Sequence, residues 1–331
     1  MSEFLTIGEP VVTFMSKDAD ASLVDTINYF KLLGGAELNV AIGVQRLGHT
    51  TEYVSRLGAD PLGGYAKKQI LEHGVGTTFV TEDADNWTGF QLKQMVTTGD
   101  PQTFNYRTGS AAAHLSADVL DDVKLDDVKI AHMSGIFPAL SETSNQAFRH
   151  LMDRLVAADK LITFDPNLRP ALWNDDERMI REINEFAKSA DIILPGMNIR
   201  LKLLPGMNEG KILMGSEDPK DIADFYLNQS DRTKVVIVKV GPAGAYVQTR
   251  DAEGFMVPGF KVNNVVDTVG AGDGFALGVF TALLEDKSLR SAAMRGNAVG
   301  ALQVQTPGDN DGYPTPAQLK AFYEAEGVSE D

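Results

Sequence analysis

The chain has 331 residues, of which 43% are hydrophobic, and this suits one large α/β domain or two small ones. Its 46 acidic residues outnumber its 30 basic ones, and the resulting net charge of −16 disfavours nucleic acid as a partner. The chain has no cysteine and no apolar run of membrane-spanning length, which excludes disulfides, thiol chemistry and a transmembrane helix.

Strand-like and helix-like patterns alternate along most of the chain. The opening MSEFLTIGEP lacks a basic segment followed by a long apolar run, so we expect a cytoplasmic protein whose first strand is 4–8. Further strands are expected at 51–58, 129–135, 160–167, 190–195, 234–241 and 245–249. Helices are expected at 36–47, 65–74, 144–158, 176–188, 219–229, 272–285 and 289–303. This alternation predicts an α/β fold with a mainly parallel sheet and helices on both faces.

Two stretches, 9–33 and 86–110, interrupt this alternation. Neither has helical periodicity, and WTGFQLKQMVTT within the second alternates as a half-exposed strand does. We interpret them as a small β-rich lid standing off one domain that spans residues 1–331. The alternative is that they are surface hairpins without function.

The pentapeptide LPGMN occurs twice, at 194–198 and 204–208. A match so close in the chain indicates a short local duplication, because structural repeats need several units of about 20 or more residues. Only the second copy is followed by an acid, Glu209.

The segment DTVGAGDGFALG, residues 267–278, places a glycine-rich loop at the expected start of a helix. The backbone amides of such a loop and the positive helix end form an anion site. The helix dipole is expected to keep Asp273 ionised, which makes it a candidate base for a substrate hydroxyl in phosphoryl transfer. The alternative is that Asp273 only caps the helix.

GGAELNVAIGVQRLGHTTEYVSRLGADPLGGY (34–65) and DTVGAGDGFALG together resemble the two signature segments of the ribokinase-like, PfkB-type carbohydrate kinases. The resemblance covers nearly the whole chain, and D-T-x-G-A-G-D is matched at every fixed position. It implies a three-layer αβα fold with a β-sheet lid. It also implies that Asp273 is the catalytic base, and that Gly270, Ala271 and Gly272 form the anion hole.

The resemblance extends to the nucleotide and metal sites and implies ATP and Mg²⁺ as cofactors. VKVGPAGAYV (238–247) resembles the family's nucleotide-binding strand and turn, with Lys239, Gly241 and Gly244 near ATP. Asn297 matches a residue of the adenine pocket. Glu209 resembles the acid of an Asn-x-x-Glu region that organises Mg²⁺, although the usual spacing is not kept. The alternative for Glu209 is a solvated glutamate at a helix start.

Three segments resemble the 2-keto-3-deoxygluconate kinases within this family, namely FNYRTGSAAAHLS (104–116), HMSGIFPALS (132–141) and FDPNLRPALW (164–173). The two arginines in them, Arg107 and Arg169, fit a substrate carboxylate, because a planar guanidinium matches a carboxylate and an acidic protein needs local cations. The alternatives are that Arg169 pairs with Asp165 or caps a turn, and that Arg107 is a solvated lid residue.

The same resemblance implies the remaining sugar contacts. Gly34 and Gly35 match a glycine pair that lets a sugar hydroxyl approach the backbone. Asn39 either lines this pocket or faces the lid. Tyr106 and Gln91 are expected to contact the sugar from the lid, although the subfamily has two adjacent tyrosines before the arginine and a tyrosine where Phe90-Gln91 stands here.

We therefore expect a kinase that phosphorylates the terminal hydroxyl of 2-keto-3-deoxygluconate, and that forms a homodimer through its lid. A fructokinase or another neutral-sugar kinase of the family is the alternative enzyme. A catalytically silent sugar- or nucleotide-binding regulator is the alternative from another class, and an intact Asp273 argues against it.

Overall fold

A computed structural model describes residues 2–97, 101–197 and 208–331. Within these residues nine strands form one large sheet in the order β13-β12-β11-β10-β9-β8-β1-β4-β5. Its strands from β5 to β11 run parallel, while β12 and β13 are antiparallel additions at one edge. The strands are β1 (Phe4–Ile7), β4 (Thr51–Gly58), β5 (Gly76–Asp83), β8 (Ile130–Ser134), β9 (Leu161–Asp165), β10 (Ile192–Ile193), β11 (Val235–Lys239), β12 (Gly244–Thr249) and β13 (Ala252–Pro258).

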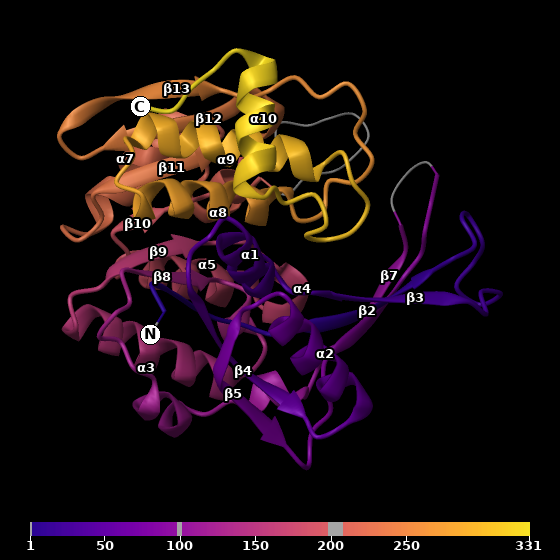
Figure 1. The fold of residues 1–331 in the computed structure, drawn as a ribbon. Coiled ribbons are helices and arrows are strands. Elements are labelled where there is room, and N and C mark those ends of the chain that lie inside the picture. Colours follow the sequence, from indigo (N-terminus) through magenta and orange to yellow (C-terminus); the bar gives the residue numbers. More distant parts are fainter. Residues whose placement is uncertain (1, 98–100, 198–207) are drawn as a thin grey trace.

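Helices cover both faces of this sheet (Figure 1). They are α1 (Ala36–Arg46), α2 (Pro61–Glu72), α3 (Glu142–Ala157), α4 (Pro170–Trp173), α5 (Asp176–Ala187), α6 (Glu209–Met214), α7 (Pro219–Gln229), α8 (Ala271–Leu284), α9 (Leu289–Gln303) and α10 (Pro316–Glu326). One apolar core packs α1, α8, α9 and α10 against the sheet, and a second packs α3, α5, α6 and α7 against the other face. The two layers and the sheet give the expected three-layer architecture.

The central strands are apolar on both faces because both faces are covered. In β1, Phe4 belongs to the core with α8 and α9, whereas the next residue, Leu5, belongs to the core with α3 and α5. Ile237 and Val238 of β11 divide between the same two cores. Successive side chains of a strand point to opposite faces, so a strand buried on both faces is apolar throughout.

A small four-stranded sheet, in the order β3-β2-β6-β7, stands beside the large one and projects from the body (Figure 1). Its strands are β2 (Val11–Ser16), β3 (Tyr29–Gly34), β6 (Phe90–Lys93) and β7 (Thr103–Tyr106), all from the two stretches without helical periodicity. The β2–β6 pairing is parallel and the others are antiparallel.

The expected strands and helices are present, with shifts of a few residues at their ends. The helix expected at 65–74 begins at Pro61, because Asp60 caps it by accepting from the backbone N–H groups of Leu62 and Gly63. The strands at Gly76–Asp83 and Ala252–Pro258 were not expected, nor were the helices at Pro170–Trp173, Glu209–Met214 and Pro316–Glu326. Among the described residues, no helix is long and apolar enough to cross a membrane.

Candidate active site

The carboxyl ends of the parallel strands meet along one edge of the large sheet, and the predicted site residues gather there. β1 leads into Glu9, β9 ends at Asp165 and β11 ends at Lys239. Helix α1 crosses against α8, where Gly43 leaves room for Leu277 that a Cβ atom would remove. In open α/β sheets this edge is the usual place for a ligand.

The loop before α8 leaves backbone amides free, as an anion site requires. Gly270 is the N-cap of α8 with φ 75°, and a Cβ atom there would clash with the carbonyl of Asp309, so only glycine fits. The Tyr313 hydroxyl donates to the Gly270 carbonyl at 2.9 Å. Among the described residues, none accepts from the backbone N–H of Gly272 or Asp273. These two amides are available to a phosphoryl group.

Asp273, in the first turn of α8, is held by an amide and not by a cation. Asn39 Nδ2 of α1 donates to Asp273 Oδ2 at 2.9 Å, and Asn39 Oδ1 accepts from Asn310 Nδ2 at 2.9 Å. Asn39 therefore faces neither the lid nor solvent but orients the candidate base. Asn310 is a member of this network that the sequence did not indicate.

The pKa of Asp273 moves in the direction opposite to that expected from a helix start alone. Burial raises the pKa of this carboxyl to about 6, against the hydrogen bond from Asn39; the charge of Asp165 raises it further, and those of Arg169 and Lys239 oppose the rise. Asp273 is still mostly ionised at neutral pH, as a general base must be, but burial outweighs the N-terminal dipole.

Two further acids, Asp165 and Glu209, lie near Asp273, and the ammonium group of Lys239 offsets their charge. Lys239 Nζ donates to Asp165 Oδ2 at 2.5 Å. Glu209 is buried and accepts from the backbone N–H groups of Leu168 at 2.8 Å and Gly196 at 2.5 Å. The two carboxylates raise the pKa of Lys239 against the effect of burial. Glu209 is thus not a solvated helix-start residue.

The carboxylate oxygens at this place suit a Mg²⁺ ion that takes most of its ligands from phosphate and water. In the described part of the chain, no group of three or more His, Cys, Asp or Glu side chains has the arrangement of a metal site. Mg²⁺ commonly takes only one or two carboxylates and completes its shell with water and substrate phosphates. Glu209 is the acid that would hold it. Residues 198 and 204–207 of the two LPGMN copies lie outside the described residues.

The two predicted carboxylate-binding arginines differ in how they are fixed. Arg107 Nε donates to the buried Glu9 at 2.5 Å, and the Ser110 hydroxyl occupies the other Glu9 oxygen at 2.5 Å. Within the described residues, the terminal nitrogens of Arg107 have no hydrogen-bond partner, so they remain free for a ligand. Arg169 is exposed and donates to the carbonyls of Asn167 and Leu168. It does not pair with Asp165, but its charge acts on Asp273.

The small sheet separates two of the predicted sugar contacts. Gln91 lies opposite Asn105 on β7, whereas Tyr106 lies opposite Phe90, so Gln91 and Tyr106 are on different faces. Gln91 donates to the hydroxyl of Thr13 at 2.7 Å. The Tyr106 ring stacks on Phe90 with centroids 4.7 Å apart. Asn105, where the subfamily has a tyrosine, shares the Gln91 face.

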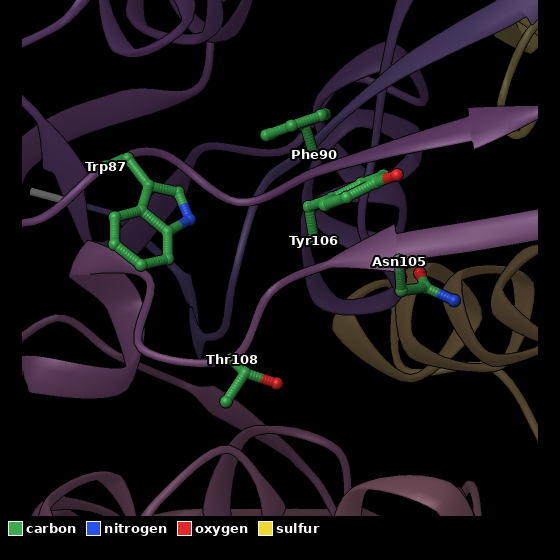
Figure 2. Close-up of a pocket in the computed structure, with 5 residues that line it drawn as sticks. All are labelled: Trp87, Phe90, Asn105, Tyr106 and Thr108. Atoms are coloured by element: carbon green, nitrogen blue, oxygen red, sulfur yellow. The ribbon is translucent and has the colours of Figure 1, made fainter.

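The Tyr106 face forms a hollow of about 370 Å³ at the base of the small sheet. Figure 2 shows the Trp87 ring across this hollow from the stacked rings of Phe90 and Tyr106, with Thr108 between the two sides. Asn105, which shares the face of Gln91, also lines this hollow. The sugar contact expected for Tyr106 stays a prediction.

The remaining predicted glycines lie where the backbone conformation or a close neighbour favours glycine. Gly35 has φ 125°, and a Cβ atom at Gly34 would clash with the Asp309 carboxylate. Gly244 has φ 108° and approaches the backbone of Val257, while Gly241 has φ 56° and open space around it.

The amide of Asn297, which was expected near the adenine, donates to the carbonyls of Val257 and Pro258 at 3.1 Å. This contact joins α9 to the end of β13.

Glu37 is a further residue that sequence reasoning missed as part of this site. It lies in the first turn of α1, is buried, and its Oε1 atom has no hydrogen-bond partner among the described residues. Burial raises the pKa of Glu37 to about 7, and the charge of Asp273 contributes to the rise, whereas Arg107 opposes it. Its sequence signal is an acidic residue among the apolar residues of a predicted helix, where a charged side chain is seldom buried without a partner.

Residues 1–316 match the family model of the pfkB family carbohydrate kinases. The chain is 40% identical to the 2-dehydro-3-deoxygluconokinase of Bacillus subtilis strain 168 over 323 residues, which cover 97% of this chain and 95% of the relative. It is 30% identical to the probable chloroplastic fructokinase-6 of Arabidopsis thaliana over 317 residues, or 93% of this chain and 79% of that one.

Among solved structures, the chain superposes on an Escherichia coli protein assigned as a ribokinase II, in complex with ATP and Mg²⁺. The TM-score is 0.86 at 24% identity, and the match covers 98% of this chain and 100% of the other. This similarity confirms the ribokinase-like fold.

Proposed function

The chain belongs to the PfkB family of carbohydrate kinases, and from this premise we propose that it phosphorylates the terminal hydroxyl of 2-keto-3-deoxygluconate with ATP. The support for a kinase site is Asp273, a partly buried carboxylate with no cation bonded to it, beside the free amides of Gly272 and Asp273. A sugar kinase needs this combination of a base and an anion hole.

In the proposed reaction Asp273 accepts the proton of the terminal sugar hydroxyl while the hydroxyl oxygen bonds to the γ-phosphorus of ATP. The bond between that phosphorus and the bridging oxygen breaks, and ADP leaves with the electron pair. The amides of the 270–273 loop stabilise the charge on the transferring group. Mg²⁺, when bound, would offset the charge of the triphosphate. Lys239, Gly241, Gly244 and Asn297 are proposed to lie along the nucleotide.

One observation favours a sugar acid over a neutral sugar. The Glu9 carboxylate fixes Arg107 by its Nε and leaves the two terminal guanidinium nitrogens free, as recognition of a carboxylate requires. We propose that these nitrogens, with Arg169, bind the substrate carboxylate, and that Gly34, Gly35 and Gln91 line the rest of the sugar pocket. The 40% identity to a 2-dehydro-3-deoxygluconokinase agrees with this choice.

The test is ADP release with Mg-ATP and a panel of 2-keto-3-deoxygluconate, 2-keto-3-deoxygalactonate, gluconate, fructose and ribose. We expect kcat/KM for a keto-deoxy acid to exceed that for fructose. In Arg107→Gln this preference should fall by about 10- to 100-fold, since a hydrogen bond to a charged group is lost. A preference for fructose would support the fructokinase alternative, and no ADP release with any sugar would support a silent binder.

We also infer that two copies pair through the outer face of the small sheet. Phe104 is 53% exposed there, Tyr106 is 47% exposed and Trp87 beside them is 49% exposed, and an aromatic surface of this kind indicates a protein interface. Phe104→Glu should convert a dimer to a monomer in light scattering. Leu71→Glu, at a 55% exposed position on α2, is the control and should leave the mass unchanged.

A further inference from the structure

Lys93, at the end of strand β6, connects the small sheet to the segment that precedes the anion-hole loop. Its side chain is buried, and Lys93 Nζ lies 3.3 Å from Asp267 Oδ2, 174 residues away in the chain. A lysine is seldom buried unless it has a charged partner. The burial of Lys93 therefore indicates a role other than keeping the strand soluble.

The strand register places Lys93 on the face of the small sheet that looks into the site. Lys93 lies opposite Met15 and Gln91 opposite Thr13, and residues two apart share a face. Phe90 and Leu92 occupy the other face with the exposed aromatic residues. Lys93 therefore extends from the sugar side of the sheet toward α8.

Asp267 transmits this contact to the turn before α8. Its Oδ1 atom accepts from the Val269 backbone N–H at 3.0 Å while its Oδ2 atom faces Lys93. The carbonyls of the same turn are held from the other side, because Gln303 Nε2 donates to Val269 at 3.2 Å and Tyr313 donates to Gly270. These contacts hold the carbonyls of Val269 and Gly270 and the Asp267 carboxylate in place, next to the free amides of Gly272 and Asp273.

Charge gives a second reason for a cation at this place. Asp309 approaches Gly34 and Gly270 and is partly buried. Burial raises the pKa of Asp309, the charges of Asp267 and Asp311 raise it further, and that of Lys93 lowers it. The charges of Asp267 and Asp309 beside this turn would repel a phosphoryl group. Lys93 offsets this repulsion only while the small sheet lies over the site.

We propose that Lys93 is a positioning residue: its ion pair with Asp267 orders the anion-hole turn when the small sheet covers the sugar. Phosphoryl transfer is then efficient only while the small sheet is in this position. The proposal rests on the proposed role of the 270–273 loop, but not on the identity of the sugar. It assigns Lys93 no contact with the substrate.

The test is steady-state kinetics of Lys93→Gln, with the sugar that the wild type uses best. We expect kcat to fall by about 10- to 100-fold, because a misplaced catalytic group costs this much, while the KM for the sugar changes by less than about threefold. Lys93→Arg should restore most of kcat. Lys31→Gln is the matched control: this lysine is exposed on β3, with its ammonium group over the Tyr65 ring, and the change should leave kcat unaltered.

A double-mutant cycle separates the pair from other effects. Asp267→Asn should reduce kcat by a similar factor, and the double variant should be no slower than the slower single one. A rise in sugar KM at constant kcat, or additive losses in the double variant, would overturn the proposal. Melting temperatures equal to that of the wild type in all variants would exclude loss of folding as the cause. If Lys93→Gln is unstable, the kcat of Lys93→Arg together with that of Asp267→Asn tests the proposal. If the wild type phosphorylates no sugar, the proposed kinase function itself is contradicted.

Discussion

Two aspartates at the same edge of the large sheet have opposite surroundings. Asp165, at the end of β9, accepts from the ammonium group of Lys239 at 2.5 Å. Asp273, in the first turn of α8, accepts from the neutral amide of Asn39 at 2.9 Å. The two carboxylates lie close enough for the charge of Asp165 to raise the pKa of Asp273.

The difference assigns the two carboxylates different tasks. A carboxylate bonded to a buried ammonium group serves as the partner of that cation, and its loss would leave the cation without this partner. A carboxylate oriented by an amide keeps a free oxygen, and burial brings its pKa toward the working pH. The pair shows how one acidic site can hold both a structural acid and a base.

Replacement of the base should have the largest effect on activity. Asp273→Asn keeps the shape and the helix start but removes the proton acceptor, so kcat should fall by about 100- to 10,000-fold. ATP affinity, measured by titration calorimetry, should stay close to the wild type. An Asn variant that turns over at nearly the wild-type rate would show that Asp273 only caps α8.

Replacement of the neutralised acid should mainly reduce stability. Asp165→Asn leaves Lys239 buried without its partner, and this should lower the free energy of unfolding by about 3–5 kcal/mol in denaturant titrations. The double variant Asp165→Asn with Lys239→Met should regain much of this loss. Unchanged stability in Asp165→Asn would mean that the two aspartates are not distinguished by their partners.

Removal of the amide partner should have a smaller effect that depends on pH. In Asn39→Ala the pKa of Asp273 should rise above about 6, because the lost hydrogen bond stabilises the ionised form. The ionised fraction at pH 7 then falls, and kcat should fall by about 2- to 4-fold. Since a higher pH restores the carboxylate, the variant should approach the wild type near pH 8. A deficit that is equal at all pH values would indicate lost packing instead.

The sequence predicted the architecture because that depends on local patterns. Apolar runs bounded by glycine indicated strands such as Phe4–Ile7, and helical spacing indicated α8 and α9, since burial on both sheet faces leaves a signal in each segment. The strand at Gly76–Asp83 had a weaker signal, because its residues are mostly half-buried at the sheet edge.

The site could be predicted only where a motif is continuous. The 270–273 loop and Asp273 lie in one segment, but the groups that orient them come from distant parts of the chain. Asn39 is 234 residues from Asp273, and Glu9 is 98 residues from Arg107. The face on which Tyr106 lies depends on strand register, which the composition of the strand does not determine.

The measurement that tests the account most directly is the pH dependence of kcat/KM from pH 5 to 8 for the wild type and for Asp273→Asn. A base whose pKa is about 6 is protonated below that value, so the wild-type kcat/KM should fall as the pH falls through about 6. Glu37→Gln, which removes the neighbouring acid with a pKa of about 7, should keep this acid limb.

The residual activity of Asp273→Asn should be independent of pH over this range. A wild-type profile without an acid limb, or a limb that persists in Asp273→Asn, would contradict the assignment of Asp273 as the base.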